Sequence, residues 1–165
     1  MHYRNRTLFT LLFAGMLSLT TAQTLAEQDA HHHHGGGAAA KLSLHNGAKW
    51  KTDATLRQGM EHIRNLLEPQ LTAIHNDKLK PMQYGVLTKK INAELSAIVT
   101  GCKLDKEADA MLHLVLADII EGTDGLGGKN KQLGRHGGTV KIYQALENYN
   151  TYFDHPGWRP ITHVE

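Results

Sequence analysis

The fold of this chain is decided by residues 82–102, which read MQYGVLTKKINAELSAIVTGC. Apolar residues recur here every three or four positions, the spacing that places side chains on one face of an α-helix. Polar residues fall between them, off that face. The stretch therefore predicts an amphipathic helix with one buried stripe, whose members are Tyr84, Leu87, Ile91, Leu95, Ile98 and Cys102.

The segment before this stretch repeats the same spacing and predicts another helix. It starts at Thr52 or Asp53, both good N-cap residues. Its apolar stripe consists of Leu56, Met60, Ile63, Leu67 and Ile74. Pro69 must then kink or end the helix, because proline lacks a backbone N–H. Trp50, just ahead of the helix, is expected to tuck the incoming chain against the fold.

Two later segments complete the helical pattern. One covers residues 105–121, with Gly122 as its C-cap, and the other covers residues 139–154 and ends before Pro156. The glycine- and lysine-rich stretch 122–138 is expected to be a long loop. Four amphipathic helices with mostly short links predict an all-α fold, specifically an antiparallel up-down-up-down four-helix bundle.

The N-terminal residues have the composition of an export signal. Arg4 and Arg6 precede an apolar run from Leu8 to Leu19, so residues 1–26 are predicted to be a secretory signal peptide. The run is too short for a stable membrane span, and we expect a periplasmic protein with no membrane insertion after cleavage. The net charge is only +2 and no long Lys/Arg block occurs, so no nucleic-acid binding is predicted.

The remainder of the chain divides into three predicted parts. Residues 27–49 form a His/Gly/Ala-rich flexible tail and a leading segment, residues 50–158 form the bundle, and residues 159–165 form a C-terminal tail. Four adjacent histidines in the first part are expected to bind copper, nickel or zinc loosely, because imidazole suits these metals. They are His31, His32, His33 and His34.

An up-down-up-down arrangement would gather soft metal ligands at one end of the bundle. Thioether, thiol and imidazole groups, which copper and haem iron prefer, occur on the helix ends that meet there. These residues are Met60, Cys102, Met111, His113 and His155. Each also has an ordinary interpretation, as a core-filling sulfur residue or a solvated histidine. His75 and His136 are isolated in the sequence and support no prediction.

Two stretches of the chain resemble a known family. Leu56–Glu61 (LRQGME) and Tyr149–His155 (YNTYFDH) are similar to the first and last helices of the periplasmic four-helix cytochromes of the b-562 and c-prime superfamily. No Cys-x-x-Cys-His motif is present, so covalent haem attachment is not expected. The resemblance implies non-covalent haem b, with Met60 and His155 as axial ligands, and one-electron transfer.

The end of the last predicted helix departs from that family. His155 precedes Pro156, whereas the family's histidine lies within a continuing helix. If the helix did continue, the His155 side chain would point about 200° away from Phe153 and out of the core stripe.

The first functional hypothesis is therefore a haem-binding electron carrier. Its porphyrin would pack against four residues, which are Leu56, Ile63, Met111 and Tyr149. A periplasmic redox protein would be its partner.

The second hypothesis is a copper-handling protein without haem. Cys102 would bind copper together with His113, Met60 or His155, and the histidine tail would deliver the metal. A metal-transfer protein would then be the partner.

The third hypothesis is a non-metal adaptor or ligand-binding bundle. No Ser-His-Asp order or His-Glu-x-x-His motif is present, so the sequence predicts no enzyme.

Overall fold

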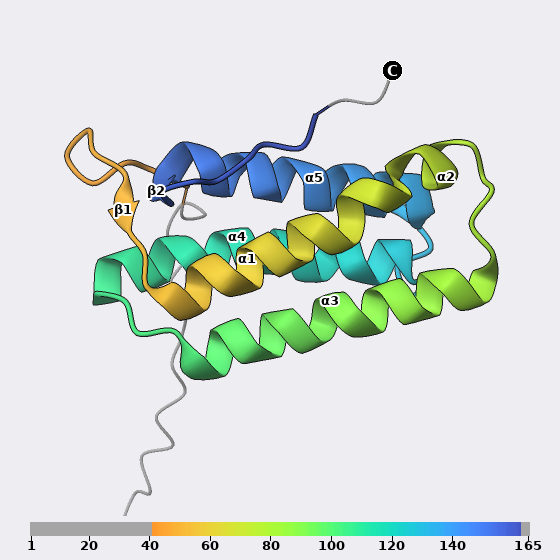
Figure 1. Cartoon of the computed structure of the whole chain (residues 1–165), viewed down its shortest axis with the longest axis horizontal. Helices are drawn as coiled ribbons and strands as arrows, with labels where there is room; N and C mark the ends of the chain where they lie inside the picture. The colour runs from red at the N-terminus through yellow and green to blue at the C-terminus, as the bar shows by residue number, and fades with distance from the viewer. Residues whose placement is uncertain (1–40, 163–165) are drawn as a thin grey trace, which may run out of the picture. The chain divides into compact units, whose positions relative to one another are not determined.

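The computed structural model describes residues 41–162. The predicted signal peptide and the histidines 31–34 lie outside the described residues. Within residues 41–162 the chain is mostly helical, which confirms the all-α class. None of the helices in this part of the chain combines the length and the apolarity that crossing a membrane requires. Figure 1 shows four long helices lying alongside one another, with a short helix after the first.

The first helix begins where the sequence predicts. α1 spans Ala54–Leu67, and the Asp53 side chain caps it by accepting the backbone N–H of Leu56 over 2.7 Å. Pro69 then changes the helix type, as its missing N–H requires. The chain continues as a 3-10 turn, η1 (Glu68–Gln70), and a short helix, α2 (Leu71–His75).

The deciding stretch forms α3, Pro81–Gly101, one residue earlier at each end than predicted. Its five predicted apolar residues from Tyr84 to Ile98 are all buried, which confirms the stripe. Cys102, the sixth, is the C-cap of α3 and is half-buried. The hydrophobic spacing therefore predicted this helix and its buried face correctly.

The predicted long loop over residues 122–138 is wrong. α4 spans Lys106–Leu126 and α5 spans Gly134–Tyr152, so only residues 127–133 connect them. Gly122 is not a C-cap but a buried residue inside α4. Sequence reasoning took glycine as a loop signal, whereas here it lies at a helix contact.

The glycines of this region let the backbones of α4 and α5 approach closely. A Cβ at Gly122 would lie 2.8 Å from the carbonyl oxygen of Gly138, and one at Gly125 would lie 3.0 Å from the carbonyl oxygen of Gly134. A Cβ at Gly138 would meet the backbone nitrogen of Leu126. Any larger residue would push the helices apart, and this contact outweighs the poor helix propensity of glycine.

Neighbouring helices are also joined by polar pairs. His62 Nδ1 on α1 lies 3.0 Å from Glu94 Oε2 on α3. Lys141 Nζ on α5 lies 2.9 Å from Asp118 Oδ1 on α4, and the hydrogen bond to Asp118 raises the pKa of Lys141.

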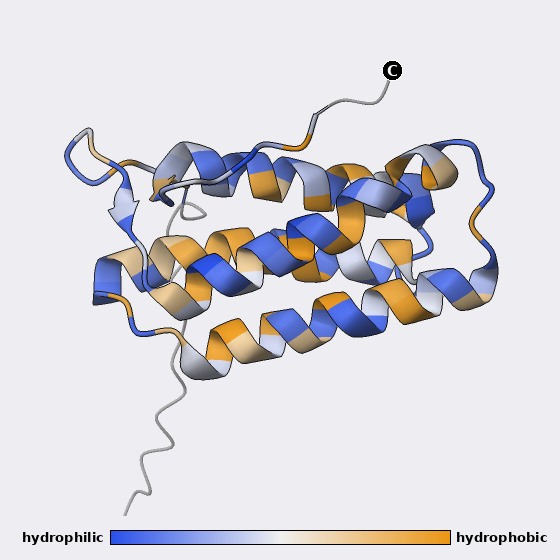
Figure 2. Cartoon of the chain, in the orientation of Figure 1, coloured by the Kyte–Doolittle hydropathy of each residue, from blue (hydrophilic) through white to orange (hydrophobic). Residues whose placement is uncertain are grey.

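Figure 2 shows apolar residues recurring along all four long helices. The largest fully buried side chains form the shared core: Tyr149, Phe153, Leu56, Met60, Ile63, Leu67, Ile74, Ile91, Ile98, Leu112, Ile119 and Leu126.

The last helix ends two residues earlier than predicted. After Tyr152 the chain becomes extended and forms β2 (Phe153–Asp154), which pairs in parallel with β1 (Trp50–Lys51). The pairing opposes Trp50 to Phe153, and both side chains are buried. Trp50 thus holds the incoming chain against the core, as predicted. The helix does not continue through His155, so the condition under which its side chain would point out of the core stripe is not met.

Candidate functional site

A buried histidine follows β2 and joins α5 to α1. His155 Nδ1 lies 2.9 Å from the hydroxyl oxygen of Tyr149, and Nε2 lies 3.2 Å from Oε1 of Glu61. The His155 side chain is only 2% exposed. Because a carboxylate can only accept, Nε2 carries the proton and donates to Glu61, while the Tyr149 hydroxyl donates to Nδ1. Neutral His155 thereby has both ring nitrogens hydrogen-bonded.

Burial favours the uncharged forms of His155 and Tyr149. Desolvation lowers the pKa of His155, and although the hydrogen bond to Glu61 acts in the opposite direction, the net shift is downward. Desolvation also raises the pKa of the Tyr149 phenol well above its ordinary value. Both directions agree with the hydrogen-bond pattern, in which the neutral forms are satisfied.

Aromatic rings enclose the histidine. The Trp158 ring centre lies 5.1 Å from that of Tyr149 and 5.2 Å from that of His155. Phe153 also stacks on Tyr149, with ring centres 5.3 Å apart. We call Glu61, Tyr149, Phe153, His155 and Trp158 the His155 cluster. The cluster fixes the chain that follows α5 against α1.

The three polar side chains of the His155 cluster are arranged like a catalytic triad. Glu61, His155 and Tyr149 place a carboxylate, an imidazole and a hydroxyl in sequence, as in hydrolases that activate a nucleophile. A nucleophile must reach its substrate, yet Tyr149 is 0% exposed and the pKa of its phenol is raised. The arrangement is therefore explained by packing, and the absence of enzymatic activity stays a prediction.

The two predicted haem ligands lie in the same region. Met60 is fully buried on α1, and the next residue, Glu61, contacts His155. Iron ligation through His155 would have to replace one of its two hydrogen bonds. Of the residues predicted to pack against porphyrin, Leu56, Ile63 and Tyr149 are fully buried. The fourth, Met111, is half-buried. Space for porphyrin would have to open within this core.

The predicted copper ligands are spread along the helices. Gly59 lies against Ile98 and Gly101 lies against Thr55, so Cys102 is level with the start of α1. Met60 is five residues beyond Thr55 along α1, about 7.5 Å at the helical rise. Burial and the nearby Asp53 and Asp109 carboxylates raise the pKa of the Cys102 thiol, which disfavours the thiolate that binds metal.

Met111 and His113 have partners of their own. The Met111 sulfur lies 3.8 Å from Ser43 Oγ, and His113 is exposed with Nδ1 2.8 Å from the carbonyl oxygen of Asp109. Over residues 41–162, no three His, Cys, Asp or Glu side chains form a group suited to hold a metal ion. The structure therefore brings Glu61, the residue after Met60, into contact with His155, and among residues 41–162 it places neither Cys102 nor His113 in a group of three His, Cys, Asp or Glu ligands.

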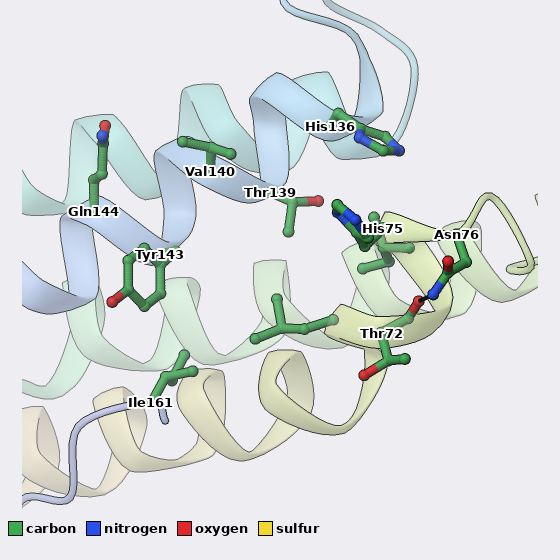
Figure 3. Close-up of a pocket in the computed structure, with 11 residues that line it drawn as sticks. Thr72, His75, Asn76, His136, Thr139, Val140, Tyr143, Gln144 and Ile161 are labelled. Atoms are coloured by element: carbon green, nitrogen blue, oxygen red, sulfur yellow. Dashed lines mark hydrogen bonds between the residues drawn. The ribbon is translucent and has the colours of Figure 1, made fainter. Parts of the chain in front are cut away.

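A cavity opens elsewhere, between α2 and α5 (Figure 3). Its volume is about 380 Å³. Leu71, Ile74, Val140, Tyr143 and Ile161 contribute apolar surface. Polar residues gather at the end formed by α2, where Figure 3 shows Thr72, His75, Asn76 and His136. The cavity thus has an apolar body and a polar end.

Two histidines from different helices meet at that polar end. The ring centres of His75 on α2 and His136 on α5 are 6.2 Å apart, with the rings tilted by 34°. His136 Nε2 lies 3.2 Å from Oδ1 of Asp77, a residue held in the left-handed region at φ +53°. Sequence reasoning missed this pair, because 61 positions separate the histidines and no local motif joins them. Only the docking of α2 on α5 reveals it.

Comparisons of the chain with protein-family models, with curated proteins and with solved structures find no match. The resemblance to the four-helix cytochromes therefore stays a prediction.

Proposed function

We propose that this protein is an exported helical binding protein that takes a small ligand in the cavity between α2 and α5. The observation that carries the proposal is the cavity itself. Its volume of about 380 Å³ lies in the range of roughly 300–1,000 Å³ typical of small-molecule sites. Such sites combine apolar walls with a few polar groups that orient the ligand, and this cavity has both.

The residues that line the cavity indicate which kind of ligand it would bind. Leu71 and Tyr143 are half-buried and Val140 is exposed, so a ligand's apolar body would cover their accessible surfaces. The imidazoles of His75 and His136 offer hydrogen bonds at the other end. Among residues 41–162, no Lys or Arg lines the cavity, so this part of the chain offers a strongly anionic ligand no permanent counter-charge. The proposed ligand is a compact molecule with an apolar body and a hydrogen-bonding head.

Filling the cavity tests this function. The probe is N-phenyl-1-naphthylamine, an uncharged dye with one N–H group whose fluorescence rises in apolar surroundings. Val140 lines the cavity and is 52% exposed, so Val140→Trp can place an indole over the opening without disturbing the core. Val99→Trp is the matched control, because Val99 is 58% exposed on α3 and does not line this cavity.

We expect Val140→Trp to weaken dye binding at least tenfold and Val99→Trp to leave it unchanged. Equal affinities in the two variants would mean that the dye binds elsewhere and would remove the support for this site. Circular dichroism of both variants checks that they are folded.

Two sequence predictions belong to the same proposal. Export to the periplasm rests on the composition of residues 1–26. The up-down-up-down bundle is supported by contacts that run in opposite directions along paired helices: Gly59 with Ile98 and Gly101 with Thr55, and likewise Lys141 with Asp118 and Gly134 with Gly125.

Haem binding is the second candidate function. The observation that favours it is the contact of Glu61 with His155, which brings His155 beside the helical turn of Met60. Haem b with a Met/His ligand pair would support one-electron transfer to a redox partner. Protein purified from haem-replete cells should then show a Soret band that shifts in Met60→Ala. A colourless, folded protein would exclude this candidate.

Copper handling through Cys102 has weaker support, because the pKa of its thiol is raised. It is tested by copper titration of the exported chain with His31–His34 replaced by asparagine. If Cys102→Ser leaves the affinity of that chain unchanged, Cys102 is not a ligand.

A further inference from the structure

We infer that His75 and His136 together bind one divalent transition-metal ion at the polar end of the cavity. This site goes beyond the proposed function, because the metal would bind whether or not an organic ligand fills the cavity. Its basis is the juxtaposition of two exposed imidazoles from α2 and α5.

The separation of the rings suits a shared ion. A metal–nitrogen bond of about 2.0–2.1 Å puts the centre of a coordinated imidazole roughly 3.2 Å from the metal. Two such rings on opposite sides of one ion therefore have centres up to about 6.4 Å apart. The observed 6.2 Å lies within this reach. Both histidines are exposed, so small rotations can bring their nitrogens to the ion without disturbing the core.

Asp77 prepares one of the ligands. Its carboxylate lies 3.2 Å from His136 Nε2, so Nε2 carries the proton and donates to Asp77. The lone pair then resides on Nδ1, which becomes the metal ligand. A carboxylate that accepts from the second nitrogen of a ligating histidine is a recurring feature of metal sites, where it fixes the tautomer.

The left-handed backbone at Asp77 accounts for this placement. Asp77 has φ +53°, and its N–H donates to the carbonyl oxygen of Ile74 over 3.0 Å. Aspartate tolerates the left-handed region better than most residues. This turn ends α2 and directs the Asp77 carboxylate toward α5. The site is thus built from the end of α2, the turn after it and the start of α5.

The two imidazoles alone define the class of metal. Imidazole suits copper, nickel and zinc, whereas calcium and magnesium require oxygen ligands. Only two protein ligands are assigned, which agrees with the lack of a three-residue group among residues 41–162. The remaining coordination positions are open to water or to the head of a cavity ligand. Affinity should follow the usual order, with Cu²⁺ bound more tightly than Ni²⁺ or Zn²⁺.

Copper titration of variants tests the site. The starting protein is the exported chain with His31–His34 replaced by asparagine, which removes the competing tail. His75→Asn and His136→Asn each delete one ligand, and Asp77→Asn weakens the support of His136. His62→Asn is the matched control, since His62 is an exposed helical histidine that contacts a carboxylate, Glu94, but has no second histidine assigned to it.

We expect the starting protein and His62→Asn to bind one Cu²⁺ with nitrogen hyperfine structure in the electron paramagnetic resonance spectrum. Each ligand deletion should weaken that binding at least tenfold, and Asp77→Asn should weaken it about tenfold. Copper should also raise the unfolding temperature, because one ion joins α2 to α5, and either deletion should abolish this rise.

The inference is overturned if either single deletion retains the copper affinity and the thermal shift. It is also overturned if His62→Asn weakens binding as much as His136→Asn, since the ion would then not be specific to this pair. Dye binding to the cavity is measured on the same variants. Loss of copper binding with unchanged dye binding supports the metal site and leaves the proposed function standing.

Discussion

The contact between α4 and α5 makes a quantitative prediction about one methyl group. Gly138 lies where the two backbones touch, and a Cβ added there would meet the backbone nitrogen of Leu126. It would also lie 2.5 Å from the carbonyl oxygen of Gly122 and 2.8 Å from the carbonyl carbon of Gly125. All three obstacles are backbone atoms, so no side chain can rotate away. Gly138→Ala must therefore separate the helices.

The size of the effect follows from two opposing contributions. Overpacking a tight contact costs typically 1–3 kcal/mol, and rigid backbone obstacles place this site at about 3 kcal/mol. Alanine is favoured over glycine inside a helix by about 1 kcal/mol. The net loss of stability should be about 2 kcal/mol, which lowers the unfolding temperature by roughly 8 °C for a domain of this size. Thermal and urea unfolding followed by circular dichroism at 222 nm measure both quantities.

Two other glycines provide matched controls for the same substitution. A Cβ at Gly137, the adjacent residue of α5, would approach only the flexible side chain of Leu133, at 3.0 Å or more. A Cβ at Gly85, inside α3, would have nothing within 4 Å. Gly137→Ala should be close to neutral, and Gly85→Ala should stabilise the fold by about 0.5–1 kcal/mol. If Gly138→Ala proves as stable as the wild type, or Gly85→Ala as unstable as Gly138→Ala, the close approach of α4 and α5 is refuted.

The remaining predictions concern buried polar groups. The pKa of His155 is lowered in the folded protein, so on acidification the unfolded chain binds a proton first, near pH 6.5. The free energy of unfolding should therefore fall as the pH drops below about 6.5. In urea unfolding, His155→Gln should flatten this part of the pH profile. Glu61→Gln should lower the pKa of His155 further, as an NMR titration would show, because the carboxylate charge opposes the shift; an unchanged or higher pKa would contradict the contact. Tyr149→Phe should reduce stability by about 1–2 kcal/mol in urea unfolding, because His155 Nδ1 loses its donor. Iodoacetamide should alkylate Cys102 more slowly than free cysteine at neutral pH, and Asp53→Asn, which still caps α1, should raise the rate.

The sequence predicted helices and their buried residues correctly where the outcome depended on a single apolar face. The spacing in α3 predicted both the helix and its buried residues, because burial of a single face is a local property of the pattern. The N-cap at Asp53 and the break at Pro69 were likewise set by local chemistry. These features need no knowledge of the rest of the fold.

The stretch 122–138 could not be predicted in the same way. Glycine favours a loop when it is considered alone, but it favours a helix when another backbone lies against it. Gly122, Gly125 and Gly138 make sense only as a set, and the set exists only after α4 docks on α5. The same limit hid the pairing of His75 with His136, since neither residue carries a local signal.

His155 shows how one local change redirects a predicted ligand. A helix extended through residue 155 would have pointed the imidazole away from the core stripe, but Phe153 leaves the helix to pair with Trp50. The residue before a proline favours extended backbone, so Pro156 supports this early ending. The imidazole consequently turns inward and meets Tyr149 and Glu61. Burial then favours its neutral form, while the two hydrogen bonds occupy the nitrogens that a metal would need. The same turn that places His155 against Glu61, the residue after Met60, therefore also satisfies its hydrogen bonds without a metal, and this is why the ligand cavity carries the proposed function.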